Sequence, residues 1–204
     1  MIAGEMIRPK GTNFTKKYFM SASLGDVYLE SVIKRLTTYK LLGEGTFRQL
    51  EEKDLYYTPN DTSNSIAIII RHLSGNMISR WTNFLTEDGE KPGRNRETEF
   101  SLEGQHYSRE QLTDQWEKGW SCLLSTLSSL KAEDLLRTIH IRHEPLIAID
   151  AINRQLAHYP HHVGQIVYIG KMIRGKDWQS LSIPKGGSDQ FNRQMQEQHG
   201  KQEL

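Results

Sequence analysis

Apolar residues recur at steps of three and four along four long segments of the chain, and this spacing limits its fold more than any other feature. Because an α-helix turns through about 100° per residue, such steps gather the apolar side chains on one helix face. The pattern predicts helices over about 24–50, 65–85, 109–130 and 145–174. With no internal repeat and little strand pattern, the chain is predicted to be all-α and to form a four-helix bundle, with an irregular all-α domain as the alternative.

Turn-forming and capping residues separate these segments. Residues 58–64 (TPNDTSN) offer several N-cap candidates before the second predicted helix. Ser108 and Gln111 form a capping-box pattern before the third. Pro145 suits the first turn of the fourth, where no backbone N–H is needed. The preceding stretch, RTIHIRHEP (137–145), alternates apolar and polar residues and is expected to be a short extended crossover.

The length of the chain indicates its domain organisation. A chain of 204 residues is long enough for one domain with a substantial core and short for two. We therefore expect a single domain over 1–204, with its core at about 22–174. An irregular lead-in precedes this core, and a loop-like segment (175–192) and a polar, fraying C-terminal tail follow it.

Composition argues against several classes of function. The chain has 26 Lys and Arg against 25 Asp and Glu and carries no basic stripe, which argues against nucleic-acid binding. No apolar run approaches the length of about 18 residues that a membrane span needs, and no signal peptide is visible. The single cysteine, Cys122, cannot form an intramolecular disulfide and is expected to be a buried structural thiol. These features lead us to expect a cytoplasmic protein.

Three of the eight histidines fall within the stretch AHYPHHVGQ (157–165). On a wheel of about 100° per residue, His158 and His162 lie within about 40° of each other on one flank of the apolar stripe, whereas His161 points away from the core. His72 lies on the equivalent flank of the second predicted helix. In a helical bundle these two flanks can face each other.

Three imidazoles that converge from two helices would offer neutral nitrogen ligands to a divalent ion such as Zn²⁺ or Ni²⁺. Three protein ligands leave a coordination position open to water or substrate, as in catalytic sites. The alternative is that these histidines are only hydrogen-bonded at a helix boundary. The remaining histidines are expected to be solvated, and these are His106, His140, His143, His161 and His199.

With His72 on the second predicted helix and His158-x-x-x-His162-Val-Gly-Gln165 on the last, the sequence resembles the DinB-like superfamily of metalloenzymes. The resemblance covers most of the chain, is closest in residues 142–173 and is similar to the uncharacterised bacterial branches. It implies a four-helix bundle, often a homodimer, in which His72, His158 and His162 bind a divalent metal ion.

The string His-Arg-Gly-Gln that is common among relatives reads His162-Val163-Gly164-Gln165 here. The arginine is therefore absent here, together with any substrate or subunit contact that it makes in relatives. Gly164 would permit the close approach of another helix. Gln165, on the histidine flank, is a candidate to hydrogen-bond a ligand histidine, with an ordinary exposed glutamine as the alternative.

The resemblance also implies a class of function, because the superfamily includes transferases and isomerases that use low-molecular-weight thiols. We therefore expect a metal-dependent enzyme, either a thiol-dependent transferase or a hydrolase, that acts on a small molecule. No general acid or base is identified, since Asn76 does not titrate and Glu110 and Asp114 are as well explained as solvated charges. The alternatives are a non-catalytic metal-binding stress or sensor protein and a helical module without metal.

Pro160 lies between the two histidines of the last helix. It lacks the N–H that would bond to the carbonyl of Leu156, and its ring crowds that carbonyl, so a local kink or a widened turn is expected. The sequence therefore leaves open whether His158 and His162 still converge.

Overall fold

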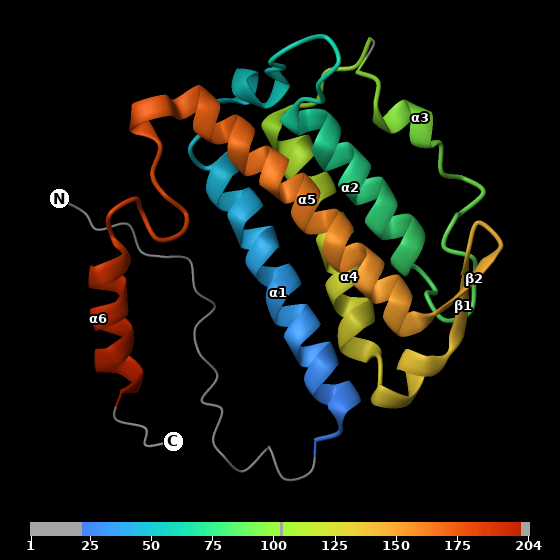
Figure 1. Cartoon of the computed structure of the whole chain (residues 1–204). Coiled ribbons are helices and arrows are strands. Elements are labelled where there is room, and N and C mark those ends of the chain that lie inside the picture. Colours follow the sequence, from blue (N-terminus) through green and yellow to red (C-terminus); the bar gives the residue numbers. More distant parts are fainter. Residues whose placement is uncertain (1–21, 103, 201–204) are drawn as a thin grey trace.

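The computed structural model describes residues 22–102 and 104–200, and the expected N-terminal lead-in lies outside them. The described residues are mostly helical, which confirms the predicted all-α class (Figure 1). Each of the four predicted segments contains a long helix, and the four pack around one apolar core. They are α1 (Leu24–Phe47), α2 (Ile66–Trp81), α4 (Arg109–Ser129) and α5 (Ala148–Arg174).

Shorter elements connect the long helices or follow them. They are η1 (Glu52–Tyr56), α3 (Arg96–Glu99), η2 (Ala132–Leu136), β1 (Thr138–Ile141), β2 (Glu144–Ile147), η3 (Gly175–Asp177) and α6 (Ser188–His199). Among the described residues, no helix combines the length and the apolar character that crossing a membrane requires.

Local sequence decides where the helices begin and end. The backbone N–H of Gln111 donates to Ser108 Oγ over 3.2 Å, and the N–H of Ser108 donates to Gln111 Oε1 over 2.8 Å, which confirms the predicted capping box. α2 ends at Trp81, earlier than predicted, because Thr82 is extended and Asn83 takes a φ of 52°. These residues turn the chain out of the helix.

The stretch predicted as an extended crossover forms a β-hairpin, and Pro145 lies in β2 rather than in the first turn of a helix. β1 pairs antiparallel with β2, with His140 opposite Pro145. The turn residues Arg142 and His143 have φ values of 55° and 64°, which tight hairpin turns need and non-glycine residues rarely adopt. Asp88 stabilises the turn by accepting the N–H groups of both residues, at 2.9 and 2.7 Å. α5 therefore begins only after the hairpin.

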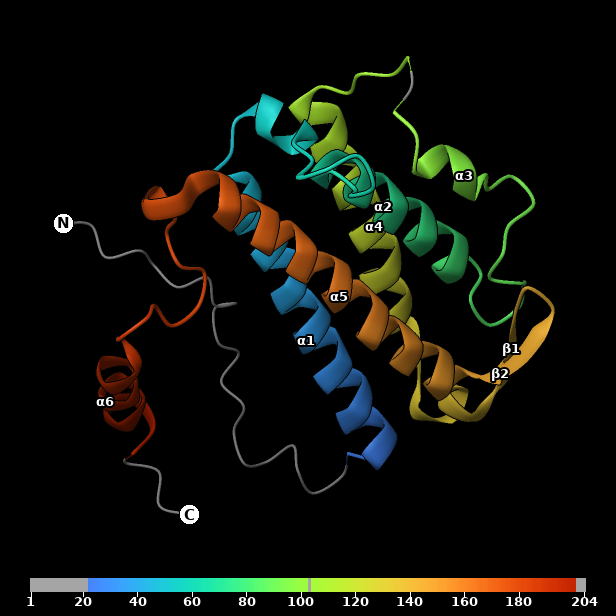
Figure 2. The same cartoon turned by 45° about the horizontal axis from the view of Figure 1, so that its top comes forward.

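The C-terminal segment also differs from the prediction of a loop and a fraying tail, because residues 188–199 form α6. These residues include no Gly or Pro and are rich in Gln, which is compatible with a helix. Phe191 and Met195, one turn apart, are half-buried. α6 lies beside the four long helices rather than among them (Figures 1 and 2).

α1 and α5 run in the same direction. Near the start of both helices, Tyr28 Oη donates to Asn153 Oδ1 over 2.6 Å. Beyond the end of both helices, the side chain of Gln49 makes hydrogen bonds of 3.0 and 2.8 Å to the backbone of Gln179. The last long helix of the chain therefore lies alongside the first.

α2 and α4 are parallel as well. Ser74 Oγ donates to the carbonyl of Gln115 over 2.6 Å, and further along both helices Thr126 Oγ1 donates to the carbonyl of Trp81 over 3.0 Å. A connection between two consecutive parallel helices has to travel back along a helix length. Residues 82–108 make this return, and they carry α3 past α2 (Figure 2).

Cys122 departs from its expected full burial, since it is half-buried at the edge of the core. It lies on the α4 face that turns toward the end of α2, where its sulfur is 3.6 Å from Thr82 Oγ1.

Candidate metal centre

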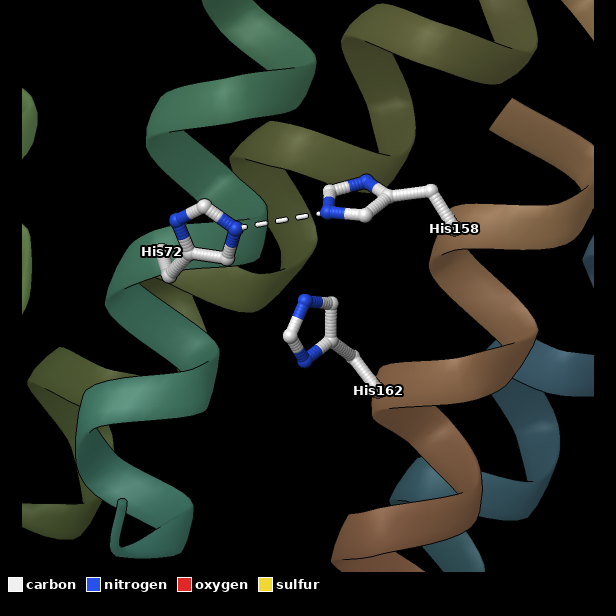
Figure 3. A group of neighbouring side chains, drawn as sticks. All are labelled: His72, His158 and His162. Carbon is white, nitrogen blue, oxygen red and sulfur yellow. Dashed lines mark hydrogen bonds between the residues drawn. The ribbon is translucent and has the colours of Figure 1, made fainter. Parts of the chain in front are cut away.

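The structure brings His72, His158 and His162 together. His72 extends from α2 and the other two extend from α5, and the three rings point toward one another across the gap between these helices (Figure 3). One nitrogen atom of each ring lies within 4.8 Å of the corresponding atoms of the other two. His72 is buried, whereas His158 and His162 are half-buried.

Pro160 does not separate the two histidines of α5. The helix continues through Pro160 from Ala148 to Arg174. The ring centroids of His158 and His162 lie 4.8 Å apart. The proximity expected from the i, i+4 spacing is therefore retained.

His72 has a charged partner behind it that sequence reasoning missed. Its Nδ1 lies 3.0 Å from Glu99 Oε2. Burial would raise the pKa of Glu99, but hydrogen bonds from Arg94 and His72 outweigh burial and lower it, so the carboxylate is ionised. An ionised carboxylate only accepts hydrogen bonds, so Nδ1 of His72 is the donor. In the neutral ring, the lone pair then belongs to Nε2, which faces His158.

His162 has a similar arrangement with an uncharged partner. Its Nδ1 lies 2.9 Å from Gln165 Oε1, and Gln165 Nε2 lies 3.2 Å from His161 Nε2. Donation from His162 to the amide oxygen leaves its lone pair on Nε2. Gln165 thus makes the contact that its position on the histidine flank suggested. His161 is exposed and does not belong to the group of three.

Burial keeps the two α5 imidazoles uncharged. Desolvation, followed by the neighbouring histidines His162 and His72, lowers the pKa of His158 to about 3. Desolvation also lowers the pKa of His162, against the opposing effect of its bond to Gln165. Metal ions bind neutral imidazole, so both rings are in the required form at neutral pH.

The spacing of these nitrogens fits a shared divalent ion. Two imidazoles that bind one tetrahedral zinc ion at about 2.0–2.1 Å place their nitrogens about 3.3 Å apart. The Nε2 atoms of His72 and His158 are 3.5 Å apart. A ring nitrogen of His162 lies within 4.8 Å of these atoms, close enough for the three rings to share one ion. Nδ1 of His158 is buried with no hydrogen-bond partner among the described residues, so an ion would select its tautomer.

The other candidates lie elsewhere. The remaining histidines that were expected to be solvated are exposed, and they are His106, His140, His143 and His199. Glu110 and Asp114, for which solvation was one of two explanations, are exposed as well. Asn76 is buried and accepts the Tyr159 hydroxyl at 3.0 Å. None of these residues belongs to the group of three histidines.

The contact of Glu99 and Arg94 with the histidine group could not be predicted from the sequence. Both lie in the polar stretch between α2 and α4, and no periodic spacing relates them to His72. Only the parallel direction of α2 and α4 forces this stretch back past the histidine. The single signal in the sequence was its length, since residues 82–108 are more than a turn between adjacent helix ends requires.

Comparison with known proteins gives one match to a protein family. No curated protein matches the chain. A family model described as "Protein of unknown function (DUF1572)" matches residues 23–187, which include the four long helices and all three histidines of the group. Because the match covers well over half of the chain, the protein belongs to the DUF1572 family.

Proposed function

We propose that this protein is a divalent-metal-dependent enzyme on a DinB-like four-helix bundle, with His72, His158 and His162 as the metal ligands. The observation that carries the proposal is the convergence of three imidazoles from two helices, with their nitrogens within 4.8 Å. The DinB-like resemblance of the sequence supports it, and DUF1572 is a DinB-like family. The homodimer suggested by the same resemblance is part of the proposal.

The character of the ligands favours certain ions. Imidazole suits Zn²⁺, Ni²⁺ and other borderline divalent ions better than it suits Mg²⁺ or Ca²⁺. Three protein ligands would leave at least one coordination position for solvent or substrate. When bound, such an ion would supply Lewis acidity and would favour deprotonation of a coordinated water or thiol.

The charges around the site favour an anionic substrate group. The three histidines are neutral ligands, and Glu99, whose carboxylate contacts His72, is paired with Arg94. The protein therefore leaves the charge of a divalent ion largely uncompensated. A thiolate would supply this charge, which supports a low-molecular-weight thiol as the substrate of a transferase. A hydrolase that uses a bound hydroxide is the second reaction class compatible with the same ligands.

The test is elemental analysis of the purified protein beside single alanine variants. We expect about one divalent ion per chain in the wild type, as for other three-histidine sites. His72→Ala, His158→Ala and His162→Ala should each lose it. His161→Ala is the matched control, because His161 lies on the same helix outside the group and should leave the metal content unchanged.

The outcomes separate the candidate functions. A wild type without metal, even after incubation with Zn²⁺ or Ni²⁺, would contradict the proposal. Metal without turnover in a screen for thiol transfer and hydrolysis would favour a non-catalytic metal-binding protein. Turnover that is lost together with the metal in the three variants would support the enzyme.

A further inference from the structure

We propose that Glu99, held in place by Arg94, is a positioning residue for His72, so that the connection between α2 and α4 forms part of the metal site. The inference rests on the proposed function of the three histidines. It starts from a buried contact, since His72 is 4% exposed, Glu99 is 8% exposed and the atoms that join them are 3.0 Å apart. A carboxylate in this position points Nε2 of the ring toward His158.

Arg94 fixes the carboxylate itself. Its Nε and Nη2 atoms donate to the two oxygens of Glu99 over 2.7 and 2.8 Å, and its side chain is 6% exposed. Two parallel hydrogen bonds from a planar guanidinium define both the position and the plane of the carboxylate. The Glu99 carboxylate is therefore restrained, and its hydrogen bond restricts rotation of the His72 ring.

The surface of α2 is shaped to receive this carboxylate. Gly75 lies one turn after His72, and a Cβ atom added there would lie 2.9 Å from Cδ of Glu99 and closer still to Oε1. A larger residue at this position would push the carboxylate away from the helix. The glycine costs helix stability relative to alanine, so a packing requirement explains its presence.

Two further contacts hold the connection against α2. Arg71, next to His72 in the sequence, donates to the carbonyl of Thr98 over 2.7 Å and also to that of Ser101. The ring of Phe100 lies with its centroid 4.6 Å from that of His72. The imidazole is thus held at its Nδ1 edge by Glu99 and on its surface by Phe100, which leaves Nε2 directed into the site.

This arrangement has two consequences for the metal. It selects the Nδ1–H tautomer of His72 in the metal-free protein, so no tautomer change is needed on binding. It also increases the electron density at Nε2, because a carboxylate hydrogen-bonded to Nδ1 makes the ring a more basic ligand. An ion pair that served only to attach the connection to α2 would have neither effect.

The decisive experiment compares Glu99→Gln with Glu97→Gln. The control lies on the same short helix, but its side chain is 88% exposed and its ion pair with Arg96 spans 3.7 Å. Zinc affinity would be measured by competition with a chromophoric chelator on the full chain. We expect Glu99→Gln to weaken binding by about 10- to 100-fold, the range typical of groups that hydrogen-bond a ligand histidine, and Glu97→Gln to match the wild type.

A second readout does not depend on metal. Nitrogen-15 NMR of the metal-free protein reports which nitrogen of His72 carries the proton, and His72→Ala identifies the signals. We expect the Nδ1–H form in the wild type and in Glu97→Gln, and a mixture of tautomers in Glu99→Gln. A role confined to attaching the connection would leave the tautomer unchanged as long as the protein folds.

Gly75→Ala provides a variant that keeps every polar group. It should favour the α2 helix and yet weaken zinc binding by displacing Glu99, which separates positioning from folding if Glu99→Gln is unstable. Wild-type zinc affinity in both Glu99→Gln and Gly75→Ala would overturn the inference, as would an unchanged His72 tautomer in Glu99→Gln. A wild type that binds no metal would overturn the proposed function instead, and the NMR experiment would still decide whether Glu99 positions His72.

Discussion

The Nε2 atoms of His72 and His158 lie 3.5 Å apart, although 86 positions separate the two residues in the sequence. They come from different helices, and Glu99 on the far side of the His72 ring leaves a lone pair on the nitrogen that faces His158. Two neutral imidazole nitrogens in this arrangement are joined either by a hydrogen bond from an Nε2–H of His158 or by a cation that both lone pairs bind. This relationship leads to the first prediction.

Added zinc should stabilise the wild type against unfolding. A ligand that binds only the folded state at 100 times its dissociation constant adds about 2.7 kcal/mol to the free energy of unfolding. Thermal melts with and without Zn²⁺ would measure this effect. His158→Ala should show little or no shift and His161→Ala the full shift, so equal shifts in all three proteins would mean that zinc binds elsewhere.

Tyr159→Phe should destabilise the protein by about 1–3 kcal/mol, the cost of leaving buried polar groups unpaired. The Tyr159 hydroxyl accepts from Trp81 Nε1 over 2.9 Å and donates to Asn76 Oδ1 over 3.0 Å. Removing it leaves both of these groups without a partner in the core. Urea denaturation would measure the loss of stability. Tyr168→Phe is the control, because Tyr168 is 66% exposed. Equal losses in the two variants would contradict this explanation.

The hairpin should contribute stability that depends on pH through Asp88. The backbone N–H of Glu90, together with those of His143 and Arg142, lowers the pKa of Asp88 from 3.8 to about 2 against the opposing effect of burial. Since the pKa in the folded state is the lower one, the carboxylate stabilises the fold above about pH 4, and this stabilisation disappears as the pH falls toward 2. The wild type should therefore exceed Asp88→Asn in stability at pH 5–7.

Denaturation of both proteins between pH 7 and pH 3 would test this prediction. The gap in their free energies of unfolding should be constant down to about pH 4 and should narrow below it. Asp61→Asn, in the exposed loop before α2, is the matched control. A gap that widens on acidification would show that the sign is wrong.

Two glycine substitutions should have opposite effects. A Cβ at Gly119 in α4 would lie 2.8 Å from Cα of Ser74 in α2, so Gly119→Ala must move the two backbones apart at a cost of about 1–3 kcal/mol. A Cβ at Gly164 would meet nothing within 4 Å among the described residues, and Gly164→Ala should stabilise the protein by about 0.5–1 kcal/mol through helix propensity. Chemical denaturation would measure both changes. Destabilisation by Gly164→Ala would reveal a neighbour beyond the part of the chain that the structure describes.

Much of the helical framework could be predicted from local pattern. Apolar steps of three and four, together with the capping box at Ser108, located α1, α2, α4 and α5 to within a few residues of most ends. The hairpin could not be located in this way. Its turn residues, Arg142 and His143, are neither glycine nor asparagine, the residues usually found at positive φ. They adopt positive φ because Asp88, more than fifty positions earlier in the sequence, accepts hydrogen bonds from their backbone N–H groups.

In the candidate site as well, local sequence determined some contacts and tertiary packing determined the others. The sequence by itself determined that His158 and His162 share one flank of a helix, because residues four apart are neighbours on any α-helix and the helix runs through Pro160. Only the tertiary structure decided that His72 lies close to these two histidines and that the Glu99 carboxylate contacts Nδ1 of His72. Both depend on which helices lie side by side and on the parallel direction of α2 and α4, which returns the connecting segment past the histidine. Helix periodicity is set within a few residues, whereas the path of a connection is set by the packing of the whole core.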